Sequence, residues 1–155
     1  MATEKQFAFF KSLYDEECKR GEELHDHAKN NLGLATLYSA FILFVIEKLR
    51  PESACSKLIF VATILFMLAA FLLSLWATQI SIYEAVNEPE DILEELGDSQ
   101  PTDEDFFDDR IADYTVAYER DSEVNDKKAN QLLVARYFLL VGIALHACYF
   151  VVMLV

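Results

Sequence analysis

The sequence contains little glycine, proline or cysteine. Among 155 residues there are four glycines, three prolines and three cysteines. So few turn-forming residues leave little room for β-turns or flexible linkers, which favours a helical protein. The cysteines, Cys18, Cys55 and Cys148, have no paired spacing and form no CxxC motif, so we expect no disulfide framework. No phosphate-binding loop, nucleotide motif or nucleophile–base pair is recognisable, and we therefore expect no enzymatic activity and no cofactor.

Basic residues are also scarce relative to acidic ones. The chain has 13 Lys and Arg against 26 Asp and Glu, which gives a formal net charge of -13. Because phosphate backbones are bound by clustered Lys and Arg, we expect no direct nucleic-acid partner. The same chain is 54% hydrophobic. High charge and high hydrophobicity are compatible when the two kinds of residue are segregated, as in a small membrane protein.

Three apolar runs dominate the chain: Leu32–Ile46, Leu58–Ile80 and Leu132–Val155. The second run has no charged residue and is long enough to cross a hydrocarbon core of about 30 Å. The first run is shorter and spans the bilayer only if Glu47 and Lys48 extend toward the surface or the bilayer thins locally. We predict three transmembrane helices, with the first two joined by a turn containing Pro51.

The remaining residues predict helices outside the bilayer. Residues 4–31 place apolar side chains at alternating steps of three and four, so one helix should run from about Glu4 to Leu49. After a loop near Pro101, a second long helix should run from about Glu104 to the C-terminus. The fold class is therefore all-α: an integral membrane protein whose three transmembrane helices extend into a cytoplasmic helical bundle. The predicted parts are a cytoplasmic amphipathic helix (1–31), a transmembrane hairpin (32–80, with spans 32–49 and 58–80), an acidic cytoplasmic segment (81–131) and a third span (132–155).

The chain resembles itself at an offset of 100 residues. Between residues 4–35 and 104–135, nine of 32 ungapped positions are identical. The identical residues of the first segment are Glu4, Phe7, Tyr14, Arg20, Glu23, Asp26, Asn30, Leu32 and Ala35. Two interpretations remain open: parallel repeats that enter the bilayer from the same face, or unrelated helices that share an amphipathic composition.

Several residues are candidates for function. Asp105, Asp108, Asp109 and Asp113 belong to an acidic stretch that is either a solvated helical face or a cation-concentrating vestibule at a pore mouth. Among the polar residues within the spans, four are candidates: His146, Arg136, Tyr38 and Ser39. We expect Arg136 to act as a snorkelling anchor, whereas His146 either hydrogen-bonds another helix or faces a water-filled lumen. The hydroxyls of Tyr38 and Ser39 are candidates for interhelical hydrogen bonds.

Two weaker patterns involve the first helix. Arg20 and His25 have the R-x4-6-H spacing of HEPN ribonucleases, although the motif is short and Asn125 replaces His25 in the second segment. His25-Asp26-His27 resembles a metal-binding tripeptide, but helical residues at i and i+2 point to different faces. We therefore predict no metal site.

The segments HDHAKNNLGLATLYSAFIL (25–43) and NDKKANQLLVARYFLLVGIAL (125–145) resemble the helix-into-membrane junctions of small bacterial effectors. The most similar plans are those of SLATT-type effectors and of the transmembrane effectors of Pycsar systems. Some small CRISPR-associated membrane proteins have a similar plan. These families have two or four spans, whereas three are predicted here. The resemblance implies a protein of antiphage defence that oligomerises and breaches the inner membrane.

These observations lead to one main functional expectation and two alternatives. The main expectation is a homo-oligomeric pore or channel in the bacterial inner membrane, with the lipid bilayer and an upstream signalling or defence protein as partners. The distribution of Lys and Arg favours a cytoplasmic N-terminus. The first 31 residues are too polar for a secretory signal, so the first span should direct insertion. The alternatives are a non-conducting membrane scaffold and a membrane-tethered HEPN-like ribonuclease.

Overall fold

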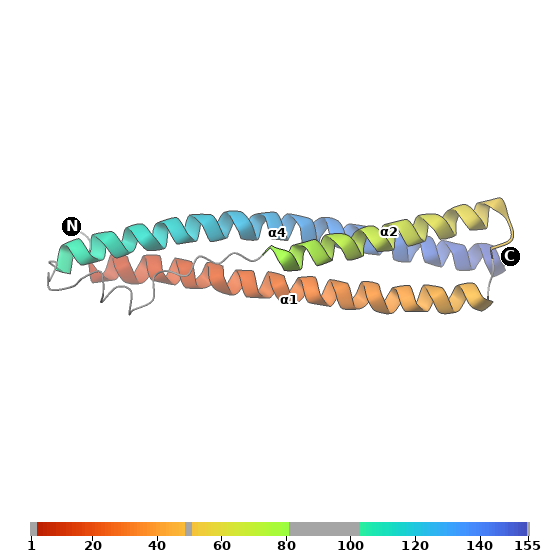
Figure 1. Cartoon of the computed structure of the whole chain (residues 1–155), viewed down its shortest axis with the longest axis horizontal. Coiled ribbons are helices and arrows are strands. Elements are labelled where there is room, and N and C mark those ends of the chain that lie inside the picture. The colour runs from red at the N-terminus through yellow and green to blue at the C-terminus, as the bar shows by residue number, and fades with distance from the viewer. Residues whose placement is uncertain (1–2, 49–50, 81–102, 155) are drawn as a thin grey trace. The chain divides into compact units, whose positions relative to one another are not determined.

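The structure, a computed structural model, is all-α, as the sequence predicts (Figure 1). It describes residues 3–48, 51–80 and 103–154, except for the side chains of residues 47, 48, 103–105 and 154. Within these residues the helices are α1 (Glu4–Lys48), α2 (Ala54–Gln79) and α4 (Asp103–Leu154). All three are long and apolar enough to cross a membrane by their length and composition. The fold is therefore that of a membrane protein with three candidate spans.

Helix α1 runs for 45 residues without a break, as the periodicity predicts. Its first turn is closed by a reciprocal cap. The Thr3 hydroxyl accepts from the backbone N–H of Gln6 at 3.4 Å, and the Gln6 side-chain oxygen accepts from the Thr3 N–H at 2.9 Å. This arrangement satisfies amide donors that the start of a helix leaves without intrahelical partners.

Helix α2 begins immediately after the predicted turn. The Ser53 hydroxyl accepts from the backbone N–H of Ser56 at 3.0 Å and so caps the first turn. Pro51 precedes this cap, at a position where it interrupts no helical hydrogen bond. Helix α2 ends at Gln79, with Ile80 as its C-cap. The predicted loop near Pro101 lies outside the described residues.

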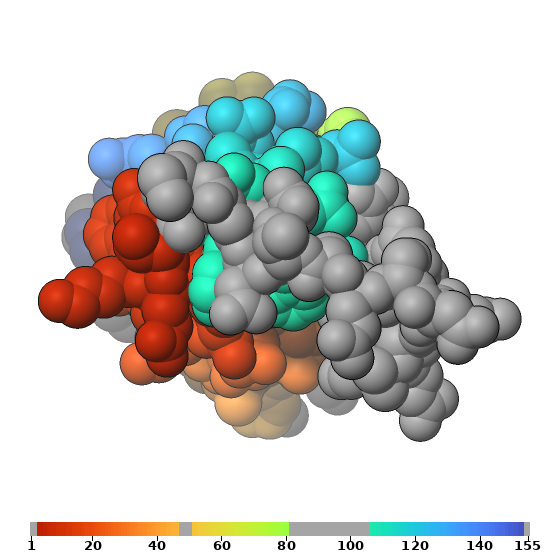
Figure 2. Space-filling view, turned by 90° about the vertical axis from the view of Figure 1, so that its left-hand side faces the viewer, coloured from red at the N-terminus to blue at the C-terminus, as the bar shows by residue number. Residues whose placement is uncertain are grey.

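The chain divides into two compact units, and each long helix contributes to both. The first unit comprises Met1–Glu23 and Ser81–Lys127, and the second comprises Leu24–Ile80 and Lys128–Val155. In the first unit α1 and α4 lie side by side and parallel, and Figure 2 shows their first turns in red and green. Phe7 contacts Phe107 with ring centroids 5.6 Å apart, and Tyr14 contacts Tyr114 at 5.5 Å. Equivalent positions of the 100-residue repeat therefore pack against each other.

The second unit is a three-helix bundle in which α2 is antiparallel to α1 and α4 (Figure 1). Its apolar core gathers side chains from all three helices. The fully buried members are Ala35, Ile42, Val45, Phe60, Met67, Ala70, Leu139 and Tyr149. A second, smaller cluster contains Ala28, Ala77 and Leu132. Small residues recur in both clusters, which allows the backbones to approach closely as in other membrane bundles.

Buried positions alternate at steps of three and four along the helices, and we call these positions the seam. In α2 they are Ser56, Phe60, Thr63, Met67, Ala70, Ser74 and Ala77. In α4 they continue from Ala117 through Asp121, Asn125, Lys128, Leu132, Ala135, Leu139, Gly142, His146 and Tyr149. The mean step of 3.5 residues is the period of left-handed coiled-coil packing.

The seam of α1 matches that of α4 at the offset of the sequence repeat. Glu17, Gly21, Ala28, Ala35 and Ile42 are buried, and so is each residue 100 positions further on. Of these pairs, only Ala35 and Ala135 are identical residues. The shared burial pattern thus adds a structural correspondence to the nine sequence identities, and it favours the interpretation as parallel repeats.

The outward faces of the second unit carry large apolar side chains. Three examples are Leu37, Leu43 and Leu58, which are 71%, 69% and 73% exposed. Similar side chains continue along all three helices, whereas water-soluble monomers rarely expose contiguous apolar surface of this kind. These faces are suited to contact with lipid.

Two glycines provide a matched test of this packing. A Cβ added at Gly142 would lie 2.7 Å from Met67 Sδ, whereas one added at Gly33 would meet nothing within 4 Å. We expect Gly142→Leu to lower the free energy of unfolding by about 1–3 kcal/mol, because it overpacks the contact between α2 and α4. Gly33→Leu should leave stability unchanged or raise it. Thermal unfolding in detergent micelles measures both, and equal effects would contradict the packing described.

Candidate functional site: buried polar groups in the helix seam

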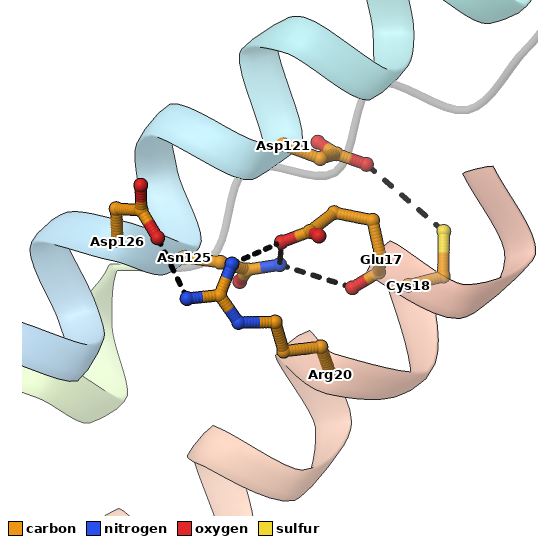
Figure 3. Close-up of polar contacts among 6 residues, drawn as sticks. All are labelled: Glu17, Cys18, Arg20, Asp121, Asn125 and Asp126. Atoms are coloured by element: carbon orange, nitrogen blue, oxygen red, sulfur yellow. Dashed lines mark hydrogen bonds and ion pairs between the residues drawn. The ribbon is translucent and has the colours of Figure 1, made fainter. Parts of the chain in front are cut away.

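A polar cluster occupies the seam of the first unit (Figure 3). Asn125 on α4 donates through Nδ2 to the Glu17 carboxylate at 2.9 Å and to the Glu17 main-chain carbonyl at 3.0 Å. Arg20, one turn further along α1, donates to the same carboxylate at 3.0 Å and to Asp126 at 2.6 Å. The guanidinium therefore bridges a carboxylate of its own helix and a carboxylate of the neighbouring helix.

These contacts satisfy groups that would otherwise be costly to bury. The Glu17 side chain is 9% exposed and Asn125 is completely buried. A buried carboxylate requires hydrogen bonds or a counter-charge, and Glu17 has both. The hydrogen bond that Arg20 donates to Asp126 raises the pKa of the Arg20 guanidinium above its ordinary value. A polar pair at a seam position also disfavours other registers, which would leave it without partners.

Cys18 lies beside this cluster. Its thiol is 4.0 Å from Oδ2 of Asp121, a weak hydrogen bond of the kind sulfur makes. Burial raises the pKa of the Cys18 thiol, and the carboxylates of Asp121, Asp15 and Glu17 raise it further. The protonated thiol is a poor nucleophile. The arrangement therefore suits a packing role for Cys18.

Arg20 and His25, the HEPN-like pair, have different surroundings in the structure. Arg20 is held between Glu17 and Asp126, so its charge is already engaged by two carboxylates. His25 is half-buried and belongs to the second unit. Arg20 therefore forms a structural ion pair between α1 and α4.

A second cluster surrounds His146 in the third candidate span. His146 is fully buried, and neither ring nitrogen has a hydrogen-bond partner among the described residues. Its ring stacks on Phe150 at 4.9 Å and meets Tyr38 edge-on at 5.4 Å. Phe41 and Tyr149 complete the enclosure at 5.7 and 6.1 Å. Among the described residues of the single chain, His146 therefore packs among aromatic rings and makes no interhelical hydrogen bond, whereas a water-filled lumen beside it stays a prediction.

The other intramembrane candidates have separate environments. Tyr38 is half-buried and contacts His146 as described. The Ser39 hydroxyl donates to the Ala35 carbonyl of its own helix at 2.7 Å, not to a second helix. Arg136 is exposed, as an anchor would be. The structure thus brings together Tyr38 and His146, but it places Ser39 and Arg136 apart from that cluster.

The acidic candidates lie near the start of α4. Asp108 and Asp109 are exposed, whereas Asp113 is half-buried and forms an ion pair with Arg110, with 3.1 Å between its carboxylate and Nη1. Arg110 also faces Asp109 at 3.6 Å, so part of the acidic charge is compensated locally. The side chain of Asp105 lies outside the described residues. Within the described part of the chain, no group of three potential ligands is placed to hold a metal ion.

The sequence did not predict the burial of several charged or amide side chains: Glu17, Arg110, Asp121, Asn125 and Lys128. Lys128 is 1% exposed, and its Nζ has no hydrogen-bond partner among the described residues. Burial lowers the pKa of the Lys128 ammonium. The sequence does indicate burial at two of these positions, because Asn125 and Lys128 continue the 3–4 spacing of the apolar residues that follow them. A polar residue at such a position predicts a seam group and not a surface group.

Comparison with family models, with curated proteins and with solved structures finds no match for this chain. The function must therefore be argued from the residues and their arrangement.

Adjacent lysines offer a test of the buried ammonium. Lys128→Met should raise the free energy of unfolding at pH 7 by about 1–4 kcal/mol, because it removes a buried charge that has no partner among the described residues. In the wild-type protein the unfolded chain binds this proton more tightly, so stability should rise as pH increases toward about 10.4, the ordinary lysine pKa. The variant should lack this contribution.

Lys127→Met is the control, since Lys127 is exposed and pairs with Glu123 at 2.6 Å. A surface pair of this kind contributes at most about 0.5 kcal/mol. Unfolding of each protein in detergent is followed by circular dichroism between pH 6 and 10. Destabilisation by Lys128→Met would show that the ammonium has a counter-charge and would contradict the assignment.

Proposed function

We propose that the protein is a bacterial inner-membrane effector of antiphage defence that assembles into a homo-oligomeric, channel-type pore, with its N-terminus in the cytoplasm. The observation that carries the proposal is the filled seam of the second unit. Gly142 faces Met67, and His146 is enclosed by aromatic rings, so no polar path runs through a single bundle of the described helices. A route for ions would have to lie between copies.

A groove on the outer surface of α1 and α2 suits such an assembly. It has a volume of about 380 Å³ and is lined by Thr36, Ser39, Ile42 and Leu43 of α1 and by Ile64, Met67, Leu68 and Phe71 of α2. In lipid, helices associate through packing of small and weakly polar surfaces. A helix of a second copy can fill this concavity, and Thr36 would then lie at the subunit contact.

The acidic first unit supports a preference for cations. Asp108 and Asp109 are exposed near the start of α4, and the chain as a whole carries a net charge of -13. Repetition of these carboxylates around a symmetric oligomer would produce a negative potential that concentrates cations. The role in defence rests on the resemblance of the two junction segments. We infer that an upstream protein supplies the trigger.

A non-conducting scaffold is the second candidate. The filled seam equally fits a protein that stays closed and uses the acidic face of its first unit to recruit a soluble partner. A membrane-tethered ribonuclease is less favoured, because Arg20 is engaged by Glu17 and Asp126. The ribonuclease alternative would require loss of RNA cleavage in His25→Ala.

Filling the groove tests the oligomeric channel. We expect Thr36→Trp to weaken self-association and to lower potassium flux into liposomes by at least about tenfold, the effect of roughly 1.4 kcal/mol per contact. Leu140→Trp is the control, since Leu140 is an α4 side chain that is 54% exposed and does not line the groove. Chemical cross-linking in the same liposomes reports assembly independently of conduction.

The two readouts separate the candidates. The channel is supported if the wild-type protein forms cross-linked oligomers that conduct potassium, and if Thr36→Trp loses both assembly and flux while Leu140→Trp keeps both. A wild-type protein that inserts but remains monomeric would contradict it and leave the scaffold. If the protein assembles but does not conduct, potassium flux is measured again with candidate partner proteins added.

A further inference from the structure

We propose that a second groove, between α1 and α4 in the second unit, binds the phosphate group of an anionic phospholipid. This groove has a volume of about 180 Å³. Its polar lining consists of His27 and Asn31 from α1 and Arg136 from α4, and its apolar lining includes Leu24, Leu132 and Leu133. The proposal depends on membrane insertion but not on whether the protein conducts ions.

The groove lies at the depth expected for lipid headgroups. The first and third predicted spans begin at Leu32 and Leu132, and the two helices are parallel, so both spans begin on the same side. His27 and Asn31 precede this boundary, while Leu133 and Arg136 follow it by a turn or less. The lining therefore changes from polar to apolar across the region where phosphate and glycerol groups reside.

The charge of the groove complements a phosphate. Side chains on a helix lean toward its N-terminus, so the Arg136 guanidinium reaches back toward the headgroup level and not into the hydrocarbon core. Among the described residues, no carboxylate lines the groove. The nearby Asp26 is exposed and faces Lys29 at 3.6 Å. A guanidinium can donate two parallel hydrogen bonds to one phosphate, and the Asn31 amide can supply a third.

The apolar lining favours a lipid over free phosphate. Leu24, Leu132 and Leu133 would gain nothing from a small hydrated anion, whereas they can contact the glycerol and first methylene groups of a phospholipid. Basic pockets between transmembrane helices on the cytoplasmic side are a recognised mode of binding anionic headgroups. We therefore commit to a phospholipid as the occupant.

Native mass spectrometry of the full chain tests the proposal. The protein is titrated in detergent with phosphatidylglycerol, and parallel samples contain phosphatidylcholine or a large excess of inorganic phosphate. We expect one phosphatidylglycerol bound preferentially per chain. Arg136→Gln should weaken its binding at least about tenfold, and Asn31→Leu should weaken it by a smaller factor.

The control is Lys57→Gln, an exposed cation in the first turn of α2 that lines neither groove. It should leave lipid binding unchanged, and circular dichroism verifies that each variant remains helical. Equal weakening by Arg136→Gln and Lys57→Gln, or no weakening by Arg136→Gln, would overturn the site. Displacement of the lipid by inorganic phosphate would overturn the assignment to a phospholipid.

Discussion

Close packing of parallel α1 and α4 through small and polar seam residues is the constraint on which the rest of the structure depends. Membrane helices gain little from hydrophobic burial against one another, because lipid tails are as apolar as leucine. Association then requires close backbone approach, which Ala35 and Ala135 permit between α1 and α4, and Gly142 between α4 and α2. In the first unit, the hydrogen-bonded pair of Glu17 and Asn125 supplies specificity in place of small-residue packing. The same 3–4 spacing thus places small residues in the seam of the second unit and a hydrogen-bonded polar pair in the seam of the first unit.

This constraint also shapes the functional argument. A seam filled by Met67, His146 and Tyr149 leaves no polar passage within the described part of one bundle, so conduction would require several copies. Burial of His146 among aromatic rings explains how an imidazole is accommodated in an apolar span without a polar partner. The outward faces are then free to contact lipid through their leucines, and to contact other copies at the groove beside Thr36.

Much of the fold follows from the sequence because its signals are local. Apolar runs, the turn at Pro51 and the scarcity of glycine and proline predict the three described helices and their limits to within a few residues. The seam partners are not predictable in this way, since periodicity identifies a buried face but not the residue opposite it. Arg20 illustrates the difference, because its spacing to His25 suggested chemistry whereas its contacts are ion pairs. Lys128 was missed because its charge suggested an exposed surface position.

The most direct test of the central claim is a cross-linking measurement of the α1–α4 register. In a background with all three cysteines changed to serine, Phe7→Cys is combined with either Phe107→Cys or Asn125→Cys. Parallel packing predicts rapid intramolecular cross-linking of the first pair, whose rings are 5.6 Å apart. The second pair should not react, because residue 125 lies about 27 Å further along α4. Cross-linking of Phe7→Cys with Asn125→Cys, but not with Phe107→Cys, would contradict the parallel seam.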